Sequence, residues 1–406
     1  MPRLPWFIAA SSLTVASVSV AQYRFPQPDI TGPETVRFPA PAKVWGAAAD
    51  THQQVHIAAA NPASGDKVTL RYLRSDTAHA RWPIQTEIPT GDDPVTIAGN
   101  ERAPRIVVTN DGAVFIAWQS KDHIAARRSA DEGKTWTPVS VRDADAQGGI
   151  DMLALAYTHG PAGKPEQIVL LWNDSRGHGK YSDQFSTALY AAVSTDGAKT
   201  FAKNIWLNPP PSNKPTTFSA PGACPCCLPS AQFDGECRLW IAYRSSDNDI
   251  KEITVLRLER AALTGANLSR TATAQTISHD NWHMVGCPMS GPRIAVEQVS
   301  AQTAAVVWTR DNETRYSIAS LRDHWSAPKS LGHAPRIAAL GFAGDLSMLW
   351  GDDKSAKLAH GIDLAKAQDA KTTGAAVLIQ LFSQPALVVP DTRAPVPKPA
   401  SAQPRH

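Results

Sequence analysis

A short segment with the pattern S-x-D-x-G-x-x-W constrains the fold of this chain more than any other feature. It occupies residues 129–136 (SADEGKTW) and recurs at residues 194–201 (STDGAKTF), with Phe for Trp and the Gly one position earlier. An Asp in such a segment accepts hydrogen bonds from backbone N–H groups of a tight turn. The Gly adopts a backbone conformation that is costly for other residues, and the aromatic ring folds back as an apolar plug. We therefore predict structural roles for Ser129, Asp131, Gly133, Trp136, Ser194, Asp196 and Phe201.

Two further segments are weaker copies of this pattern. Residues 75–82 keep the Ser-to-Trp spacing, with the Asp one position early and no Gly, and residues 320–325 look like a shortened remnant. Apolar strands recur between these segments, and the second strand of each unit usually ends in an aromatic residue. These second strands lie at residues 55–58, 114–118, 168–172, 239–243, 305–308 and 346–350. Six units of roughly 40–65 residues are typical of propeller blades, whereas a β-sandwich would not explain the repeated turn.

The repeated segment resembles the Asp box of the sialidase-like (Asp-box, or BNR-repeat) superfamily, and the resemblance covers most of the chain. It implies an all-β, six-bladed β-propeller in which each box joins the two outer strands of a blade, on the face away from the ligand funnel. Members of this family hold a sialic-acid carboxylate with three arginines and attack with a Tyr that a Glu activates. The resemblance makes Arg244, Arg310, Arg293 and Tyr316 the catalytic candidates, and no Glu is convincingly placed beside Tyr316.

Composition and terminal segments suggest an exported protein. Residues 1–21 read as a signal peptide, with one positive charge, an apolar stretch and small residues before the cleavage point. A Pro-rich segment follows at residues 22–40, part of which can close the propeller as an added outer strand. The six-bladed propeller is expected at residues 41–382, and a disordered Pro/Ala-rich tail at residues 383–406. We expect a periplasmic or secreted monomer.

Charge and hydropathy restrict the partners. The net charge of the 406-residue chain is only +3 and no basic run stands out, so nucleic acid is not an expected partner. No run after the signal peptide is long enough to span a bilayer, so we expect no membrane association after cleavage. Polar loops leaving the second strands frame the central funnel, where a carbohydrate or a small polar ligand is the expected partner.

Four of the five cysteines precede the first strands of two adjacent blades. Cys224, Cys226 and Cys227 lie directly before one first strand, and Cys287 lies directly before the next. Both entrances open onto the funnel rim, so the four cysteines are expected to meet there, whereas Cys237 is expected on the opposite face. The C-x-C-C motif together with a later W-x-x-x-x-C-P-x-x-G-P loop resembles a subset of bacterial exported sialidase-like proteins.

Three interpretations of these cysteines stay open. In the first, a disulfide between Cys287 and one of the other three holds two blades together. In the second, the thiolates bind a soft metal with His283 or His279 and with Met284 or Met289, and the candidate metals are copper and zinc. In the third, the adjacent Cys226 and Cys227 form a reducible pair. The sequence thus favours an unconventional sialidase-like protein with a cysteine-rich rim, and exo-α-sialidase-type hydrolysis and a glycan- or protein-binding module are the alternatives.

Overall fold

The computed structural model describes residues 34–63, 67–161, 163–183, 185–212, 217–264, 267–297, 303–320, 324–333, 336–343, 345–351, 356–360, 367–370, 377–380 and 385–391. The predicted signal peptide and most of the predicted tail lie outside these residues. Helical structure in the described part is limited to η1 (Asn100–Arg102), η2 (Ser175–Gly177), η3 (Arg260–Thr264) and α1 (Leu268–Thr271). None of these helices has the length and apolar character needed to cross a membrane.

The described strands form seven sheets, in which every pairing is antiparallel except that of β1 with β29. Sheets 1 to 3 are β2 (Val44–Ala49), β3 (Val55–Pro62), β4 (Val68–Arg74) and β5 (Ile84–Glu87); β6 (Arg105–Val108), β7 (Val114–Ser120), β8 (His123–Ser129) and β9 (Thr137–Pro138); and β10 (Ile150–Thr158), β11 (Gln167–Asp174), β12 (Ala188–Ser194) and β13 (Ile205–Trp206). Sheets 4 and 5 have five strands each: β14 (Ser230–Phe233), β15 (Leu239–Asp247), β16 (Ile250–Leu258), β17 (Ala272–Thr276) and β18 (Trp282–His283); and β19 (Arg293–Val296), β20 (Ala304–Arg310), β21 (Glu313–Ser320), β22 (His324–Trp325) and β23 (Lys329–His333). Sheet 6 is β24 (Arg336–Ala343), β25 (Asp345–Gly351), β26 (Ala356–His360) and β27 (Gln368–Ala370).

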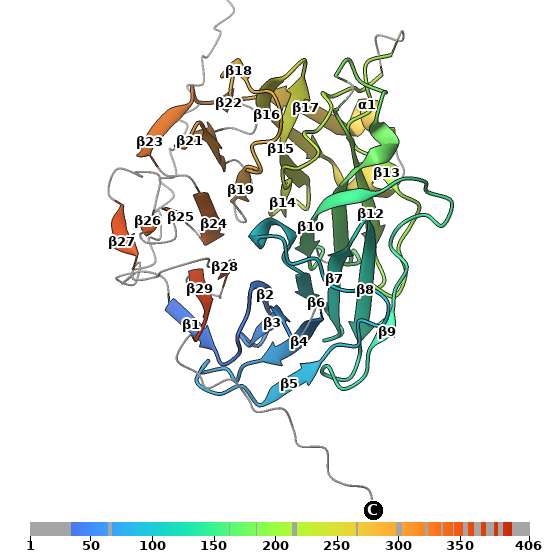
Figure 1. The fold of residues 1–406 in the computed structure, drawn as a ribbon, viewed down its shortest axis with the longest axis vertical. Coiled ribbons are helices and arrows are strands. Elements are labelled where there is room, and N and C mark those ends of the chain that lie inside the picture. The colour runs from blue at the N-terminus through green and yellow to red at the C-terminus, as the bar shows by residue number, and fades with distance from the viewer. Residues whose placement is uncertain are drawn as a thin grey trace, which may run out of the picture. The chain divides into compact units, whose positions relative to one another are not determined.

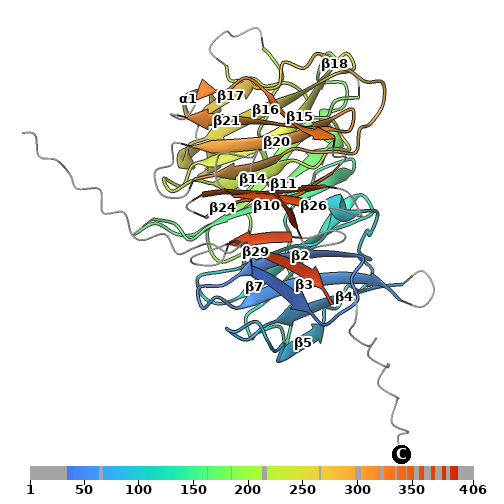
Figure 2. The same cartoon turned by 90° about the vertical axis from the view of Figure 1, so that its left-hand side faces the viewer.

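The sheets follow one another around a common centre. The first strand of each sheet contacts the first strand of the next, in the order β2, β6, β10, β14, β19, β24 and β28, and β28 returns to β2. Figure 1 shows these strands around the middle of the ring and the later strands of each sheet farther out. In the view turned by 90°, β29 lies beside β2 at the junction of the first and last sheets (Figure 2). This arrangement is a β-propeller.

The number of sheets differs from the six predicted blades. A seventh, three-stranded sheet contains β28 (Val377–Gln380), β29 (Pro385–Pro390) and β1 (Glu34–Phe38), and β1 pairs parallel to β29. The predicted propeller ends at residue 382, but β28 pairs with β29 beyond that boundary and so begins a further sheet. The predicted tail also starts too early, because residues 386–389 (ALVV) are buried in β29. The short apolar run is hidden in a Pro-rich composition, and its two prolines stand only at the strand ends, where they are tolerated.

The hydrophobic core lies between neighbouring sheets. The largest buried cluster joins sheets 3 and 4, and smaller clusters join sheets 1 and 2, 2 and 3, 4 and 5, 5 and 6, and the seventh sheet and sheet 1. The second strands supply the largest buried side chains, Trp118, Trp172, Trp240 and Trp308. Each indole N–H donates a hydrogen bond, for example from Trp172 to Asp174 Oδ2 at 2.7 Å. Burial of these four rings therefore leaves none of their indole donors unpaired.

The turn at residues 129–136 joins β8 to β9, the third and fourth strands of sheet 2. The Ser129 hydroxyl donates to Asp131 Oδ1 at 2.8 Å, and the N–H of Thr135 donates to the same oxygen at 2.8 Å. The Thr135 hydroxyl donates to Asp131 Oδ2, and this bond is the main reason that the pKa of Asp131 falls to about 2. Both carboxylate oxygens of Asp131 thus accept hydrogen bonds from its own turn, as a structural role requires.

The turn at residues 194–201 repeats this network between β12 and β13. Asp196 accepts from the Ser194 hydroxyl at 2.8 Å and from the N–H of Thr200 at 3.0 Å. Two consecutive residues have positive φ in both turns, Glu132 and Gly133 in the first and Gly197 and Ala198 in the second. Glycine at either position relieves part of the backbone strain, which explains why the pattern tolerates a shift of its Gly by one residue.

The aromatic ring that ends each turn packs on the preceding sheet. Trp136 lies edge-on to Tyr72 of sheet 1, with 5.6 Å between ring centroids, and Phe201 lies 5.4 Å from Phe115 of sheet 2. Trp325 packs in the same way on Trp240 of sheet 4, and Trp82 packs on Phe38 of the seventh sheet. The terminal aromatic therefore links neighbouring sheets, and this explains why it recurs even where the Asp and Gly do not.

We predict that Gly133→Ala destabilises the fold by about 1–3 kcal/mol. Gly133 has a φ of +86°, and a Cβ there would lie 2.4 Å from the Tyr72 ring. The matched control is Gly197→Ala, which has a similar φ of +73° but would meet only carboxylate ends, the nearest at 3.3 Å. Denaturant unfolding should show a clearly larger loss for Gly133→Ala. Equal losses would mean that contact with Tyr72 is unimportant.

Candidate functional site

The segment before β14 presents three cysteines from a fixed loop. The N–H of Cys224 donates to the Arg244 carbonyl oxygen at 2.8 Å, and the N–H of Cys227 closes a turn onto the Cys224 carbonyl at 3.3 Å. Asn173 of the neighbouring sheet donates from Nδ2 to the carbonyl oxygens of Cys224, Pro225 and Cys227, at 3.1, 2.9 and 3.2 Å. A single side chain thus gathers the carbonyl groups of the loop, and this orients its thiols.

The segment before β19 brings Cys287 to the same place. It is anchored by β18, which pairs with β16, and by the N–H of Met284, which donates to the Asp249 carbonyl at 2.9 Å. Gly291 then passes directly over the backbone of Leu228, so closely that a Cβ on Gly291 would lie 1.9 Å from the Leu228 carbonyl oxygen. The absence of a side chain at residue 291 is therefore a condition for the two loops to meet.

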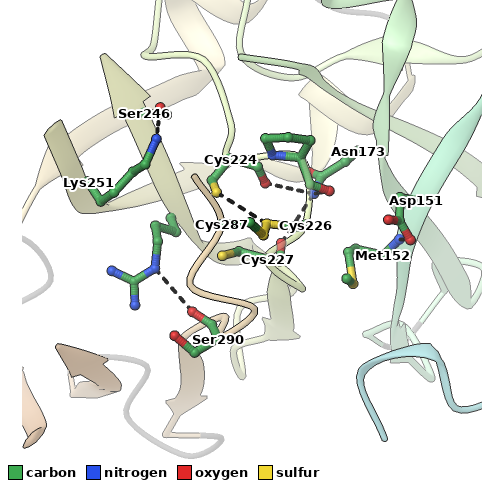
Figure 3. Close-up of a disulfide and its surroundings, with 12 residues drawn as sticks. Asp151, Met152, Asn173, Cys224, Cys226, Cys227, Ser246, Lys251, Cys287 and Ser290 are labelled. Carbon is green, nitrogen blue, oxygen red and sulfur yellow. Dashed lines mark hydrogen bonds between the residues drawn. A yellow bond between two sulfur atoms is a disulfide. The ribbon is translucent and has the colours of Figure 1, made fainter. Parts of the chain in front are cut away.

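Four sulfur atoms form a cysteine cluster of Cys224, Cys226, Cys227 and Cys287 (Figure 3). Cys226 and Cys287 form a disulfide, with 6.3 Å between their Cα atoms. The Sγ atom of Cys224 lies 3.8 Å from that of Cys226, and the sulfurs of Cys224, Cys226 and Cys287 all lie within 4.8 Å of one another. Cys227 is buried and shares a hydrogen bond with the Cys224 thiol. The predicted meeting of the two cysteine-bearing loops is thus found in the structure.

Two buried cations lie beside the cysteine cluster. Arg244 is only 1% exposed and donates to the carbonyl oxygens of Ser290 and Thr309, at 3.1 and 2.8 Å. Lys251 is 4% exposed, and its Nζ donates to Ser246 Oγ at 2.6 Å. Ser246 Oγ in turn donates to Asp183 Oδ2 at 2.6 Å, so the Lys251 charge also acts on this carboxylate, and the Arg244 guanidinium lies over the Trp282 ring. Because buried charges are normally compensated, these cations favour negative charge on the neighbouring thiols.

The two free thiols of the cluster have opposite acidities. A hydrogen bond from Cys227 is the main cause that lowers the pKa of Cys224 to about 7, and the charges of Lys251 and Arg244 act in the same direction. Burial raises the pKa of Cys227 well above its ordinary value. The arrangement therefore favours a Cys224 thiolate that accepts a hydrogen bond from a neutral Cys227 thiol.

We predict a thiolate titration near pH 7 in the protein with its disulfide intact. Since the folded-state pKa of Cys224 is below the ordinary 9.0, its stabilising effect is complete above pH 9 and is lost as the pH falls through about 7. Ultraviolet thiolate absorbance should rise through this range and lose that step in Cys224→Ser. Cys237→Ser is the control that should keep it, because Cys237 lies elsewhere, beside Thr158. A step that survives Cys224→Ser contradicts the assignment.

Several predicted site residues do not join the cluster. His283 is exposed in β18 and is not in the group of converging donors found among the described residues. Met289 is 48% exposed, and His279 is also outside that group. The short pairing of β18 with β16 directs this part of the loop outward, which the position of these residues beside Cys287 in the sequence does not reveal.

The arginine and tyrosine candidates are engaged by other protein groups. Arg293 reaches Glu101 from the opposite side of the ring, with both Nη2–Oε distances at 3.2 Å. Arg310 contacts Asp280 and Asp311 at 3.8 and 3.6 Å. Tyr316 lies in β21, the third strand of its sheet, and packs against the buried cluster that includes Trp350 of sheet 6. Of the four candidates, only Arg244 lies beside the cysteine cluster.

A Tyr–Glu pair exists elsewhere in the molecule. The Tyr157 hydroxyl donates to Glu166 Oε2 at 2.8 Å, near the turn between β10 and β11. This turn is at the opposite end of the sheet from the loops that carry the cysteines. Burial, followed by the bond to Glu166, raises the pKa of Tyr157 far above its ordinary value. A tyrosine in this state is poorly suited to act as a nucleophile.

Comparison with known proteins supports the fold. No family model matches the chain, and no curated protein matches it. Solved structures with propeller-type folds do match. The PL25 ulvan lyase is 9% identical over 86% of each chain, with a TM-score of 0.51. An α-L-arabinanase of Penicillium chrysogenum is 14% identical over 84% of this chain and 99% of that chain, with a TM-score of 0.45.

The sialidase NanB of Streptococcus pneumoniae is 12% identical, over 60% of this chain and 32% of that chain, with a TM-score of 0.34. At such low sequence identities, structural similarity shows the fold and nothing more. The alignment with ulvan lyase is the one that supports the propeller fold here. The chain is a β-propeller with a cluster of four cysteines where the loops entering two adjacent sheets meet.

Proposed function

We propose that this chain is an exported protein of the sialidase-like superfamily whose cysteine cluster binds one soft metal ion after an external dithiol has reduced the Cys226–Cys287 disulfide to two thiols and has itself become a disulfide. The convergence of three sulfurs within 4.8 Å is the observation that carries the proposal. Thiolates are the ligands preferred by Cu(I) and are also common ligands of Zn(II). The disulfide is the alternative, oxidised state of the same site, and it suits an oxidising compartment.

The surroundings of the cluster fit an ion held by thiolates. Several thiolates around one ion leave net negative charge at a partly buried place, and the neighbouring charges of Lys251 and Arg244, which lower the pKa of Cys224, compensate it. Asn173 fixes the loop through its carbonyl groups, which is the role expected of a residue outside the ligand set. Such preorganisation lowers the cost of assembling the site.

Metal titration of anaerobically reduced protein tests this proposal. We expect about one Cu(I) or Zn(II) ion per chain. Cys224→Ser and Cys287→Ser should weaken binding more than about 100-fold, since loss of outer partners alone costs roughly 10–100-fold. Cys237→Ser should bind normally, and the disulfide-containing protein should bind poorly. Reduced protein that binds no better than Cys224→Ser would leave the cysteine cluster with a structural role only.

Exo-sialidase-type hydrolysis is the alternative function. It requires arginines that receive a substrate carboxylate, but Arg293 is paired with Glu101, and Arg310 with Asp280 and Asp311. We therefore expect no turnover of a fluorogenic sialoside. Turnover that is lost in Arg310→Ala would support hydrolysis, and a glycan-array signal without hydrolysis would indicate a binding module.

A further inference from the structure

A free sulfur lies in contact with the disulfide of the cysteine cluster. Cys226 and Cys287 form this disulfide, and Cys224 is a free cysteine. The Sγ atom of Cys224 lies 3.8 Å from that of Cys226 (Figure 3), against about 2.05 Å in a disulfide bond. Exchange between a thiol and a disulfide begins when one sulfur approaches another in this way. Cys224 is therefore placed to attack the disulfide.

The three cysteines differ in their access to water. Cys224 is 1% exposed, Cys226 is half-buried and Cys287 is exposed. Attack on Cys226 expels the sulfur of Cys287, whereas attack on Cys287 expels that of Cys226. The leaving sulfur carries a negative charge, which water stabilises better than the protein interior does. Expulsion of Cys287 is therefore the favoured direction, and it is also the one that starts from the 3.8 Å contact.

The loop that would carry a new disulfide is already held in place. The N–H of Cys227 closes a turn onto the carbonyl oxygen of Cys224, and Asn173 donates to the carbonyl oxygens of both residues. Cys224 and Cys226 are two residues apart in this turn, so a disulfide between them needs no movement of the neighbouring segment. The segment that carries Cys287 would lose its covalent link to the loop, because Cys226–Cys287 is the one disulfide among the described residues.

We propose that Cys224 attacks Cys226 and exchanges the Cys226–Cys287 disulfide for a Cys224–Cys226 disulfide, which releases Cys287 as an exposed, reactive thiol. Cys224 gives up its proton and forms the new S–S bond as the old bond breaks. Cys287 leaves with the electron pair of the old bond and takes up a proton. The number of disulfides is unchanged, so no outside oxidant or reductant is consumed. The exchange needs no metal ion and is independent of the proposed function.

The released thiol is a site for external disulfide compounds. It attacks one sulfur of such a compound, forms a mixed disulfide at Cys287 and releases the other half of the compound as a thiol. Val285 and Met289, two residues away on either side, are 77% and 48% exposed, so the approach to Cys287 is open. The remaining free cysteines of the chain are buried and do not compete for the compound.

Prolonged treatment of the native, disulfide-containing protein with iodoacetamide tests the exchange. The reagent alkylates each Cys287 thiol as it forms, so even a minor isomer accumulates as product. Mass spectrometry after unfolding should find Cys287 alkylated and Cys224 bonded to Cys226. Cys237→Ser should give the same product, whereas Cys224→Ser should keep Cys287 in its disulfide. Alkylation of Cys226 instead of Cys287, or no alkylation of either, would overturn the proposal.

A pyridyl disulfide gives a second readout, since its reaction with Cys287 releases pyridine-2-thione, which is followed by absorbance. We expect about one equivalent per chain from the unmodified sequence. Cys227→Ser is the matched control, because it removes the adjacent buried thiol but not the attacking one. It should react like the unmodified sequence, and Cys224→Ser should release none. Equal release from a folded Cys224→Ser variant would overturn the role of Cys224. Should that variant not fold, the alkylation product of the unmodified sequence decides.

Discussion

Gly291→Ala is expected to separate the two cysteine-bearing loops. It should therefore prevent the Cys226–Cys287 disulfide and weaken metal binding by the reduced cysteine cluster. A Cβ at residue 291 would lie 1.9 Å from the carbonyl oxygen of Leu228 and 2.7 Å from its carbonyl carbon. The obstacle is backbone, which cannot rotate away as a side chain can. The segment that carries Cys287 must therefore shift away from the segment that carries Cys226. We expect a stability loss of about 1–3 kcal/mol and metal affinity lower by at least roughly 10–100-fold.

Gly286→Ala is the matched control for this prediction. Gly286 lies in the same loop, directly before Cys287, and has a φ of +98°, but a Cβ there would meet no atom within 4 Å. The Gly286→Ala substitution therefore strains the backbone of the same loop but causes no steric clash with Leu228. Alkylation mass spectrometry should find the Cys226–Cys287 disulfide in Gly286→Ala and free thiols in Gly291→Ala. A normal disulfide in Gly291→Ala would mean that the close approach of the loops is not required.

The repeated turns made the fold largely predictable, because their pattern is local. Hydrogen bonds from Ser129 and Thr135 to Asp131 need only neighbouring residues, so the sequence alone indicates them. The seventh sheet escaped prediction because it joins residues from both ends of the described chain, β1 and β29. Residues 22–40 were expected to supply an added outer strand, and β1 is one, but its partner β29 lies in a Pro/Ala-rich stretch whose composition favoured disorder.

The meeting of the cysteine-bearing loops was predictable, because the topology of a propeller determines it. Cys224 and Cys287 precede the first strands of adjacent sheets, and in a propeller such loops meet at one face. Side-chain direction was not predictable, and His283, close to Cys287 in the sequence, is exposed. Asn173 was visible only as one member of a polar loop.

Arg244→Leu should weaken metal binding through the charge of the site rather than through its shape. The guanidinium is 1% exposed and contributes to the low pKa of Cys224, after the larger effect of the bond from Cys227. Removing this positive charge makes each thiolate harder to form, so a higher pH is needed before the ion binds. We expect metal affinity at pH 7 to fall about 10–100-fold, and the pH midpoint of binding to move upward.

Arg244→Lys separates the charge of Arg244 from its hydrogen bonds. Lysine keeps the positive charge but cannot reproduce the fork that binds the carbonyl oxygens of Ser290 and Thr309. If the charge is what matters, Arg244→Lys should recover most of the affinity and the original pH midpoint, although its stability will be reduced. If only the paired hydrogen bonds of the guanidinium matter, Arg244→Leu and Arg244→Lys should lose the same metal affinity. The pH midpoint of binding should then not change in either variant. An unchanged midpoint in Arg244→Leu would therefore refute electrostatic support of the thiolates. The burial of Arg244 would then be explained by its hydrogen bonds and by its contact with the Trp282 ring.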